Sequence, residues 1–193
     1  MKPRSNYMNQ VQFAQLLKHV PDLEIRKWKD EDIEMIFKIS YWCGLRMIEA
    51  RRLHTEDFDL EAGEIYLGKT KTRKEDYATI PKPFMPELRY YLKNKEKGLI
   101  LDPIPTRDTV YKWLMKLGKE LNIIALTTPQ TITGEKTKTH IFRKSVGKDM
   151  MNGVHGKKAT LPTVKEHLRH EKIETTIKYL KADKEEVKDF WTS

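Results

Sequence analysis

The sequence predicts a mainly helical domain that carries one small antiparallel β-sheet of three strands. Apolar residues recur at helical spacing over most of the chain. The exception is the stretch 58–81, where short apolar segments alternate with turn residues, a pattern typical of strands and hairpins. With 193 residues the chain is long enough to bury a proper core. We therefore expect an α+β fold made of one domain, preceded by a short arm.

The N-terminal part is expected to form two helices and the start of a third. The first covers residues 8–20, is stopped by the following proline, and has one apolar face made of Phe13, Leu16, Leu17 and Val20. The second runs from about residue 30 to 43 with Ile33, Ile36, Ile39 and Cys43 facing inward. Gly44 breaks this helix, and GLRMIEARRL (44–53) begins the next one.

The remaining elements follow in order. FDLEAGEIYLG predicts two strands around a Glu-Ala-Gly turn, and YATIP predicts a third strand beyond the charged tip KTKTRKED. Helices resume at FMPELRYYL and at DTVYKWLMKLGKEL, whose apolar stripe is Val110, Trp113, Leu114, Leu117 and Leu121. LTTPQTITGEKTKT is expected to be a loop before a helix through HIFRKSVGKDMM, and a basic loop, NGVHGKK, precedes the last helical segments.

Charge and cysteine content narrow the function classes. The chain has 37 Lys and Arg against 28 Asp and Glu, a formal net charge of +9, which favours a polyanionic partner. As the polyanionic partner we expect nucleic acid ahead of an anionic membrane surface. No apolar run approaches the roughly 18 residues of a membrane span, and MKPRSNYMNQ lacks a signal-peptide core, so we expect a soluble, cytoplasmic protein. The single Cys43 gives neither a disulfide framework nor a cysteine cluster for zinc.

The segment HLRHEKIETTIKYL (167–180) poses a question about its tyrosine. If the segment is helical, Ile173, Ile177 and Leu180 fall on one apolar stripe, and Tyr179 projects roughly 120° away from the centre of that stripe. Tyr179 is therefore not an obvious core residue. Taken alone, it is most simply a boundary tyrosine with its ring tucked in and its hydroxyl in water.

Other charged residues change that interpretation. Arg46 follows a helix break, Lys69 and Lys71 lie on a hairpin tip, and His140 and Arg143 stand three residues apart. Each alone has an ordinary explanation as a solvated face, hairpin polarity or a helix-start pair. Together with His170 and Tyr179, however, they are the side chains needed to break a phosphodiester bond without a metal or another cofactor.

The chemistry assigns a role to each side chain. In-line attack makes the phosphate more negative, and bidentate guanidinium groups suit its non-bridging oxygens, so Arg46 and Arg143 are the candidate clamp. A phenol, with a pKa near 10, needs an imidazole to take its proton; His140 is the candidate base and His170 a further phosphate ligand. The departing 5′ oxygen must be protonated, and a hairpin lysine could deliver that proton. Lys71 is the first choice and Lys69 the second.

These segments resemble the tyrosine recombinase family, which includes the phage integrases and the Xer and Cre-type enzymes. GLRMIEARRL is similar to the family's first-arginine box, and HIFR (140–143) matches its H-x-x-R box. HLRHEKIETTIKYL matches its L-G-H-x-x-x-x-T-T-x-x-Y box, and GKTKTRKEDYATIP (68–81) is similar to its lysine-bearing sheet hairpin. Four boxes in the family's order, over roughly residues 28–191, are a specific signal.

The resemblance implies the family's catalytic-domain fold and its reaction. Arg46 and Glu49 occupy the first box, His170 is the second histidine of the family, and Tyr179 is the nucleophile. The expected function is site-specific recombination or integration of double-stranded DNA through a 3′-phosphotyrosyl link, by a homo-tetramer and without ATP or metal. The expected setting is cytoplasmic, associated with the nucleoid or encoded by a virus or mobile element.

Two departures from the family pattern bear on this interpretation. Arg169 stands where the family usually has glycine, and a left-handed backbone there would cost a non-glycine residue on the order of 1 kcal/mol; Arg169 is a possible phosphate contact instead. Members usually carry a separate N-terminal helical domain. We divide the chain into an arm, 1–27, and a catalytic domain, 28–193, and expect either an isolated catalytic domain or an unusually short member.

Several alternatives stay open at this point. The tail 181–193 has Val187, Phe190 and Trp191 on one stripe, which could dock on its own core or in a neighbouring protomer. A type IB topoisomerase-like enzyme shares the chemistry but does not exchange strands between two DNA molecules. A non-catalytic DNA-binding regulator on the same fold would not need Tyr179.

Overall fold

The computed structural model describes residues 7–69, 75–127 and 140–180 of the chain. It begins with α1 (Gln10–Lys18), where the Asn9 side chain accepts a hydrogen bond from the Gln12 backbone and the Gln12 side chain accepts one from Asn9. This reciprocal capping satisfies two backbone donors that a helix start leaves free. A 3₁₀ turn, η1 (Pro21–Leu23), follows, and then α2 (Asp30–Trp42), whose first turn is acidic and suits the helix dipole.

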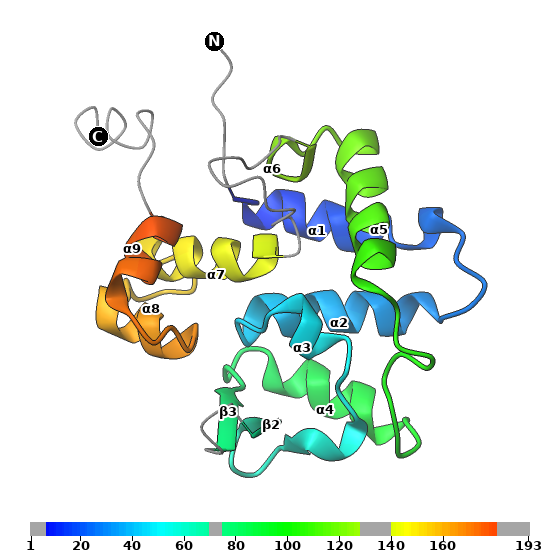
Figure 1. Cartoon of the computed structure of the whole chain (residues 1–193), viewed down its shortest axis with the longest axis horizontal. Helices are drawn as coiled ribbons and strands as arrows, with labels where there is room; N and C mark the ends of the chain where they lie inside the picture. The colour runs from blue at the N-terminus through cyan, green and yellow to red at the C-terminus, as the bar shows by residue number, and fades with distance from the viewer. Residues whose placement is uncertain (1–6, 70–74, 128–139, 181–193) are drawn as a thin grey trace.

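Helix α2 lies at the centre of the fold, with α1 and α7 on one side and α4 and the sheet on the other (Figure 1). Its inward residues Ile33, Ile36, Ile39 and the following Cys43 are buried, as predicted. Aromatic rings connect the layers: Phe37 of α2 stacks on Phe142 of α7, and Phe13 of α1 stacks on Tyr41 of α2. The first helix is therefore packed into the same core as the rest of the described chain.

The predicted sheet is confirmed. After α3 (Met47–Ala50) and a 3₁₀ turn, η2 (Thr55–Asp57), come β1 (Phe58–Asp59), β2 (Glu64–Lys69) and β3 (Glu75–Thr79). The strands are antiparallel in the order β1-β2-β3, with Ile65 of β2 opposite both Phe58 and Ala78. The register shifts between Tyr66 and Lys69, beside Gly68, whose φ of +87 suits a residue without a Cβ.

The C-terminal half is helical, as predicted. It contains α4 (Met85–Lys93), α5 (Arg107–Glu120), α6 (Ile124–Thr127), α7 (Ile141–Asn152), α8 (Leu161–His167) and α9 (Ile173–Leu180). The α5 stripe is buried from Val110 to Leu117, while Leu121 is partly buried. The single-turn α6 lies at the start of the segment that we expected to be a loop; residues 128–139 of that segment lie outside the described part. Within the described ranges, no helix is long and apolar enough to cross a membrane.

The apolar stripe predicted on α9 is exposed where the structure describes it. The side chains of Ile173 and Ile177 are 36% and 49% exposed. Among the α9 side chains that the structure describes, residues 173–177, the fully buried one is Thr176, on the side that packs toward α7 and α8. Leu180, the third member of the stripe, and the tail residues Val187, Phe190 and Trp191 have side chains outside the described part.

Candidate functional site

Arg46 is held at the junction between α2 and α3. Glu49 accepts hydrogen bonds from the Arg46 backbone amide at 2.7 Å and from Arg46 Nη1 at 2.8 Å. The Arg46 side chain is 39% exposed, so its guanidinium is fixed on one edge and open to solvent elsewhere. Gly44 permits this junction: its φ is +60, and a Cβ there would lie 3.0 Å from Leu168 Cδ2.

Arg143 lies on α7 and is the largest fully buried side chain of the structure's described part. Its Nη1 donates to the carbonyl of Gly44, and its Nη2 donates to the carbonyl of Leu168. Arg143 thus joins the start of the Arg46 segment to the end of α8. Three predicted boxes therefore meet at this guanidinium, and its two partners, Gly44 and Leu168, lie 124 residues apart in sequence.

Two histidines share this positively charged surrounding. His140 precedes α7 directly, and His170 follows α8 and is 5% exposed. Burial, followed by the charges of Arg143 and Arg46, lowers the pKa of each imidazole to about 4. Both imidazoles are therefore neutral at neutral pH, the state in which a histidine can accept a proton. His140 also lowers the pKa of His170, which places the two rings in one electrostatic environment.

Thr176 orients His170 and was missed by the sequence interpretation. Thr176 Oγ1 lies 2.9 Å from His170 Nδ1, and both side chains are buried. A hydrogen bond at Nδ1 fixes the ring and leaves Nε2 to point elsewhere. The adjacent Thr175 is exposed. The only sequence signal was the threonine pair itself, which the family box contains but which no periodicity explains.

Arg169 adopts the left-handed backbone that its glycine-like position suggested, with φ +49. Its Nη2 lies 2.6 Å from Glu49 Oε2, and its Nε lies 3.4 Å from Asp76 Oδ2 on β3. Burial alone would raise the pKa of the Glu49 carboxyl, but the charge of Arg169 and the hydrogen bonds from Arg46 hold that pKa below its usual value. Glu49 is therefore ionised and shared by two arginines.

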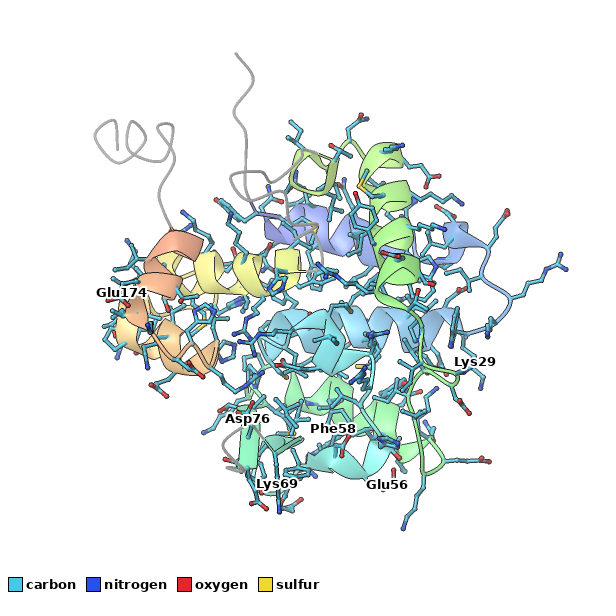
Figure 2. The ribbon with its side chains drawn as sticks, viewed as in Figure 1. Lys29, Glu56, Phe58, Lys69, Asp76 and Glu174 are labelled. Carbon is cyan, nitrogen blue, oxygen red and sulfur yellow. The ribbon has the colours of Figure 1, made fainter. Side chains whose placement is uncertain are left out.

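The remaining candidates are described only in part. Lys69 ends β2 and is exposed (Figure 2). Lys71, the first choice for the proton donor, lies outside the described residues. Tyr179 lies in α9, which packs against α7 and α8, but its side chain is outside the described part. The structure thus brings Arg46, His140, Arg143 and His170 into one electrostatic environment, and His170 lies three residues before α9, the helix that carries Tyr179.

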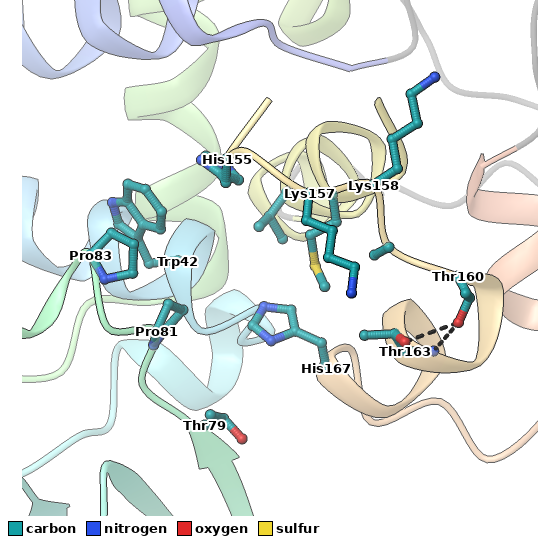
Figure 3. Close-up of a pocket in the computed structure, with 13 residues that line it drawn as sticks. Trp42, Thr79, Pro81, Pro83, His155, Lys157, Lys158, Thr160, Thr163 and His167 are labelled. Carbon is teal, nitrogen blue, oxygen red and sulfur yellow. Dashed lines mark hydrogen bonds between the residues drawn. The ribbon is translucent and has the colours of Figure 1, made fainter. Parts of the chain in front are cut away.

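A pocket of about 510 Å³ lies next to His167, at the end of α8 (Figure 3). The pocket is lined by the end of α2, the segment after β3 and the region from α7 to α8. Trp42 lies at the end of α2, and His167 lies at the end of α8. Burial, with a smaller contribution from the charge of Arg169, lowers the pKa of His167 to about 4, although its hydrogen bond with the Trp42 backbone opposes this. None of the four clustered residues lines the pocket. Among the described residues, no group of three or more His, Cys, Asp or Glu side chains could hold a metal ion.

Solved structures define the class of protein to which this fold belongs. XerA recombinase superposes with a TM-score of 0.69 at 16% identity, over 100% of this chain and 66% of that one. The catalytic domain of bacteriophage HP1 integrase gives 0.63 at 20% identity, over 96% and 93%. XerH recombinase bound to a palindromic difH substrate gives 0.66 at 22% identity, over 100% and 55%. The fold is that of a tyrosine recombinase catalytic domain.

The chain belongs to the phage integrase family, whose sequence profile matches residues 6–186. The tyrosine recombinase XerC of Chlorobaculum parvum is 28% identical over 163 residues. This alignment covers 81% of the chain and 47% of XerC, so the chain spans about half the length of this curated relative. The resemblance drawn from the four sequence boxes is confirmed at the level of family and fold.

Proposed function

We propose that this chain is the catalytic domain of a site-specific DNA recombinase or integrase that cleaves and rejoins double-stranded DNA. The observation that carries the proposal is the convergence of two arginines and two neutral imidazoles beside α9, the helix of Tyr179. Guanidinium groups suit a phosphate, and a neutral imidazole can take a proton from a phenol. A binding module would not need a proton acceptor at this place.

In the proposed reaction the Tyr179 hydroxyl attacks the scissile phosphate. A 3′-phosphotyrosyl bond forms, the bond to the 5′ oxygen breaks, and the 5′ oxygen leaves as a hydroxyl. Arg46 binds a non-bridging oxygen, and Arg143 adds its charge while holding the site together. The Tyr179 proton passes to His140, His170 binds the phosphate, and Lys71 or Lys69 protonates the leaving oxygen.

The electrostatics of the cluster support this scheme. Arginine charges help to depress the pKa of both histidines to about 4 in the absence of an anion. A phosphate bound between the arginines would offset those charges and raise the histidine pKa values. The imidazoles would then be better proton acceptors when the substrate is bound than when the site is empty.

The family supports the rest of the assignment. XerH is described in complexes with its difH substrate before and after cleavage. By this likeness we propose that strands are exchanged between two duplexes within a homo-tetramer: the free 5′ hydroxyl of one cleaved duplex attacks the phosphotyrosyl bond of the other, which releases Tyr179. The bond energy is kept in that link, so the scheme uses neither ATP nor a metal. We further propose that residues 28–193 form the catalytic domain and that 1–27 precede it as an arm.

The test requires no knowledge of the target sequence. The chain and its Tyr179→Phe variant are incubated with supercoiled plasmid at low salt without metal, quenched with SDS, and scored for relaxation and covalent protein–DNA adduct. We expect adduct with the wild-type chain alone. Equal plasmid binding with no adduct from either protein would contradict cleavage by this chain and favour a DNA-binding regulator. Relaxation without joining of two different DNA molecules would favour a topoisomerase-like activity.

A further inference from the structure

Arg169 combines an unfavourable backbone with a fully engaged side chain. Its φ of +49 lies in the left-handed region, where glycine is the residue that fits without strain. The side chain is nevertheless 11% exposed and contacts two carboxylates from distant elements. A strained backbone persists where surrounding interactions determine it, and it directs attention to what the side chain does.

The two carboxylates belong to the two halves of the candidate site. Glu49 holds Arg46 at the start of α3, and Arg169 Nη2 approaches it at 2.6 Å. Asp76 lies on β3, one residue after the described start of the strand that returns from the lysine-bearing hairpin tip (Figure 2), and Arg169 Nε lies 3.4 Å from it. The Arg169 guanidinium therefore connects the turn before His170 both to the Arg46–Glu49 pair and to strand β3.

We propose that Arg169 is a positioning residue that locks the base of the β2–β3 hairpin to the Arg46–Glu49 pair. The inference rests on the proposed function, because it concerns how the phosphate clamp and the proton-donating hairpin are held in one geometry. Productive phosphoryl chemistry depends on such geometry within fractions of an ångström. Glycine at this turn would remove the strain and the lock together.

The contacts favour positioning over direct binding of phosphate. Two edges of the Arg169 guanidinium face carboxylates, and its Nη1 is buried with no hydrogen-bond partner in the described part of the chain. Without Arg169, Glu49 would keep only the hydrogen bonds from Arg46. Among the described residues, Arg46 would then be the remaining cation bonded to that partly buried carboxylate, and its guanidinium would be less available to a phosphate oxygen.

The first experiment compares Arg169→Gly and Arg169→Lys with the wild-type chain. Both are assayed for plasmid binding at several salt concentrations and for the rate of SDS-stable adduct. We expect Arg169→Gly to bind plasmid within about 2-fold with an unchanged salt slope, and to form adduct at least about 10-fold more slowly. Arg169→Lys keeps the charge but cannot bridge two carboxylates, so its adduct rate should stay low as well.

Matched controls separate the lock from backbone and charge effects. Asn122→Gly relieves another left-handed residue, φ +53, at an exposed position, and should leave the adduct rate unchanged. Asp76→Ala removes only the hairpin contact and should slow adduct formation, whereas Glu64→Ala on the neighbouring strand should not. The double variant Arg169→Gly with Asp76→Ala should be no slower than Arg169→Gly alone, since both remove one lock.

A second readout does not depend on cleavage. Titration of the Glu49 carboxyl by carbon NMR should give a higher pKa in Arg169→Gly than in the wild-type chain, and a value close to wild type in Arg169→Lys. A wild-type chain without adduct would contradict the proposed function, while this titration would still decide whether Arg169 holds Glu49. The lock is overturned if Arg169→Gly leaves both the adduct rate and the Glu49 pKa unchanged. It is also overturned if Arg169→Gly loses plasmid affinity with a shallower salt slope, the result expected of a phosphate ligand.

Discussion

At the residue scale, Gly44 lies at the helix break before Arg46 and packs closely against His167 and Leu168, which precede His170. We expect Gly44→Ala to destabilise the fold because φ +60 costs alanine about 1–2 kcal/mol and crowding typically adds about 1–3. The crowding comes from Leu168 Cδ2 at 3.0 Å and the His167 carbonyl at 3.2 Å. Urea unfolding measures the loss. Gly63→Ala, at φ +73 with its nearest contact at 3.7 Å, should show only the backbone cost, so equal losses would contradict the crowding.

Thr176 offers a second test at the residue scale. Thr176→Val keeps the shape but leaves His170 Nδ1 buried without its hydroxyl partner, and we expect a loss of roughly 1–3 kcal/mol in the free energy of unfolding. Thr175→Val, on the exposed side of the same turn, should stay within about 0.5 kcal/mol of the wild-type value. Equal losses in the free energy of unfolding for the two variants would contradict the role of the Thr176 hydroxyl as the partner of His170.

At the element scale, a buried polar network holds α1, α2 and α7 together. The Tyr41 hydroxyl donates to the carboxylate of Asp149, which also accepts from Gln10 Nε2 at 2.7 Å. Burial, reinforced by Asp149, raises the pKa of Tyr41, so the phenol remains a donor. His155 Nε2 lies 3.1 Å from the same hydroxyl. The network connects the last turn of α7, through Asp149, to the end of α2 and the start of α1.

We expect Tyr41→Phe to lower the free energy of unfolding by roughly 1–3 kcal/mol. The variant removes the hydroxyl donor of Asp149, and of the partners named above only Gln10 would still donate to that carboxylate. Thermal or urea unfolding gives the measurement. Tyr90→Phe removes a hydroxyl from a residue that is 75% exposed and should change stability by less than about 0.5 kcal/mol. A Tyr41→Phe variant as stable as this control would show that the network does not hold the helices.

The sequence could predict the elements whose apolar residues are packed within the chain. The stripes of α1, α2 and α5 are buried because each faces another described element. Periodicity failed at α9, where Ile173 and Ile177 are exposed and Thr176 is buried. An apolar stripe indicates which face could be buried, whereas the neighbour that covers it is a matter of tertiary structure.

The same limit applies to the site. The residue types in the boxes were sufficient to predict Arg46, His140, Arg143 and His170, and the structure brings these four together. The contacts of Arg169 with Glu49 and Asp76 could not be predicted, because they join positions 120 and 93 residues apart. The catalytic roles of all six predicted residues stay predictions, and Lys71 and the Tyr179 side chain lie outside the described part.

At the scale of the whole molecule, the fold keeps three histidines neutral at pH values where an exposed histidine would be protonated. His140 precedes α7, and His167 and His170 lie at the end of α8; burial is the largest cause that lowers the pKa of each to about 4. An unfolded histidine has a pKa near 6.5. Between about pH 6.5 and 4 the unfolded chain therefore binds more protons at these positions than the folded chain does.

That difference makes the stability of the fold depend on pH with a defined sign. Because the folded pKa values are depressed, their contribution is fully present above about pH 6.5 and is lost as pH falls toward about 4. Urea unfolding at pH 7, 6 and 5 should show a falling free energy. His167→Gln can still donate to the Trp42 carbonyl but does not titrate, so the fall should be shallower. Identical slopes for wild type and His167→Gln would mean that the fold does not hold His167 neutral.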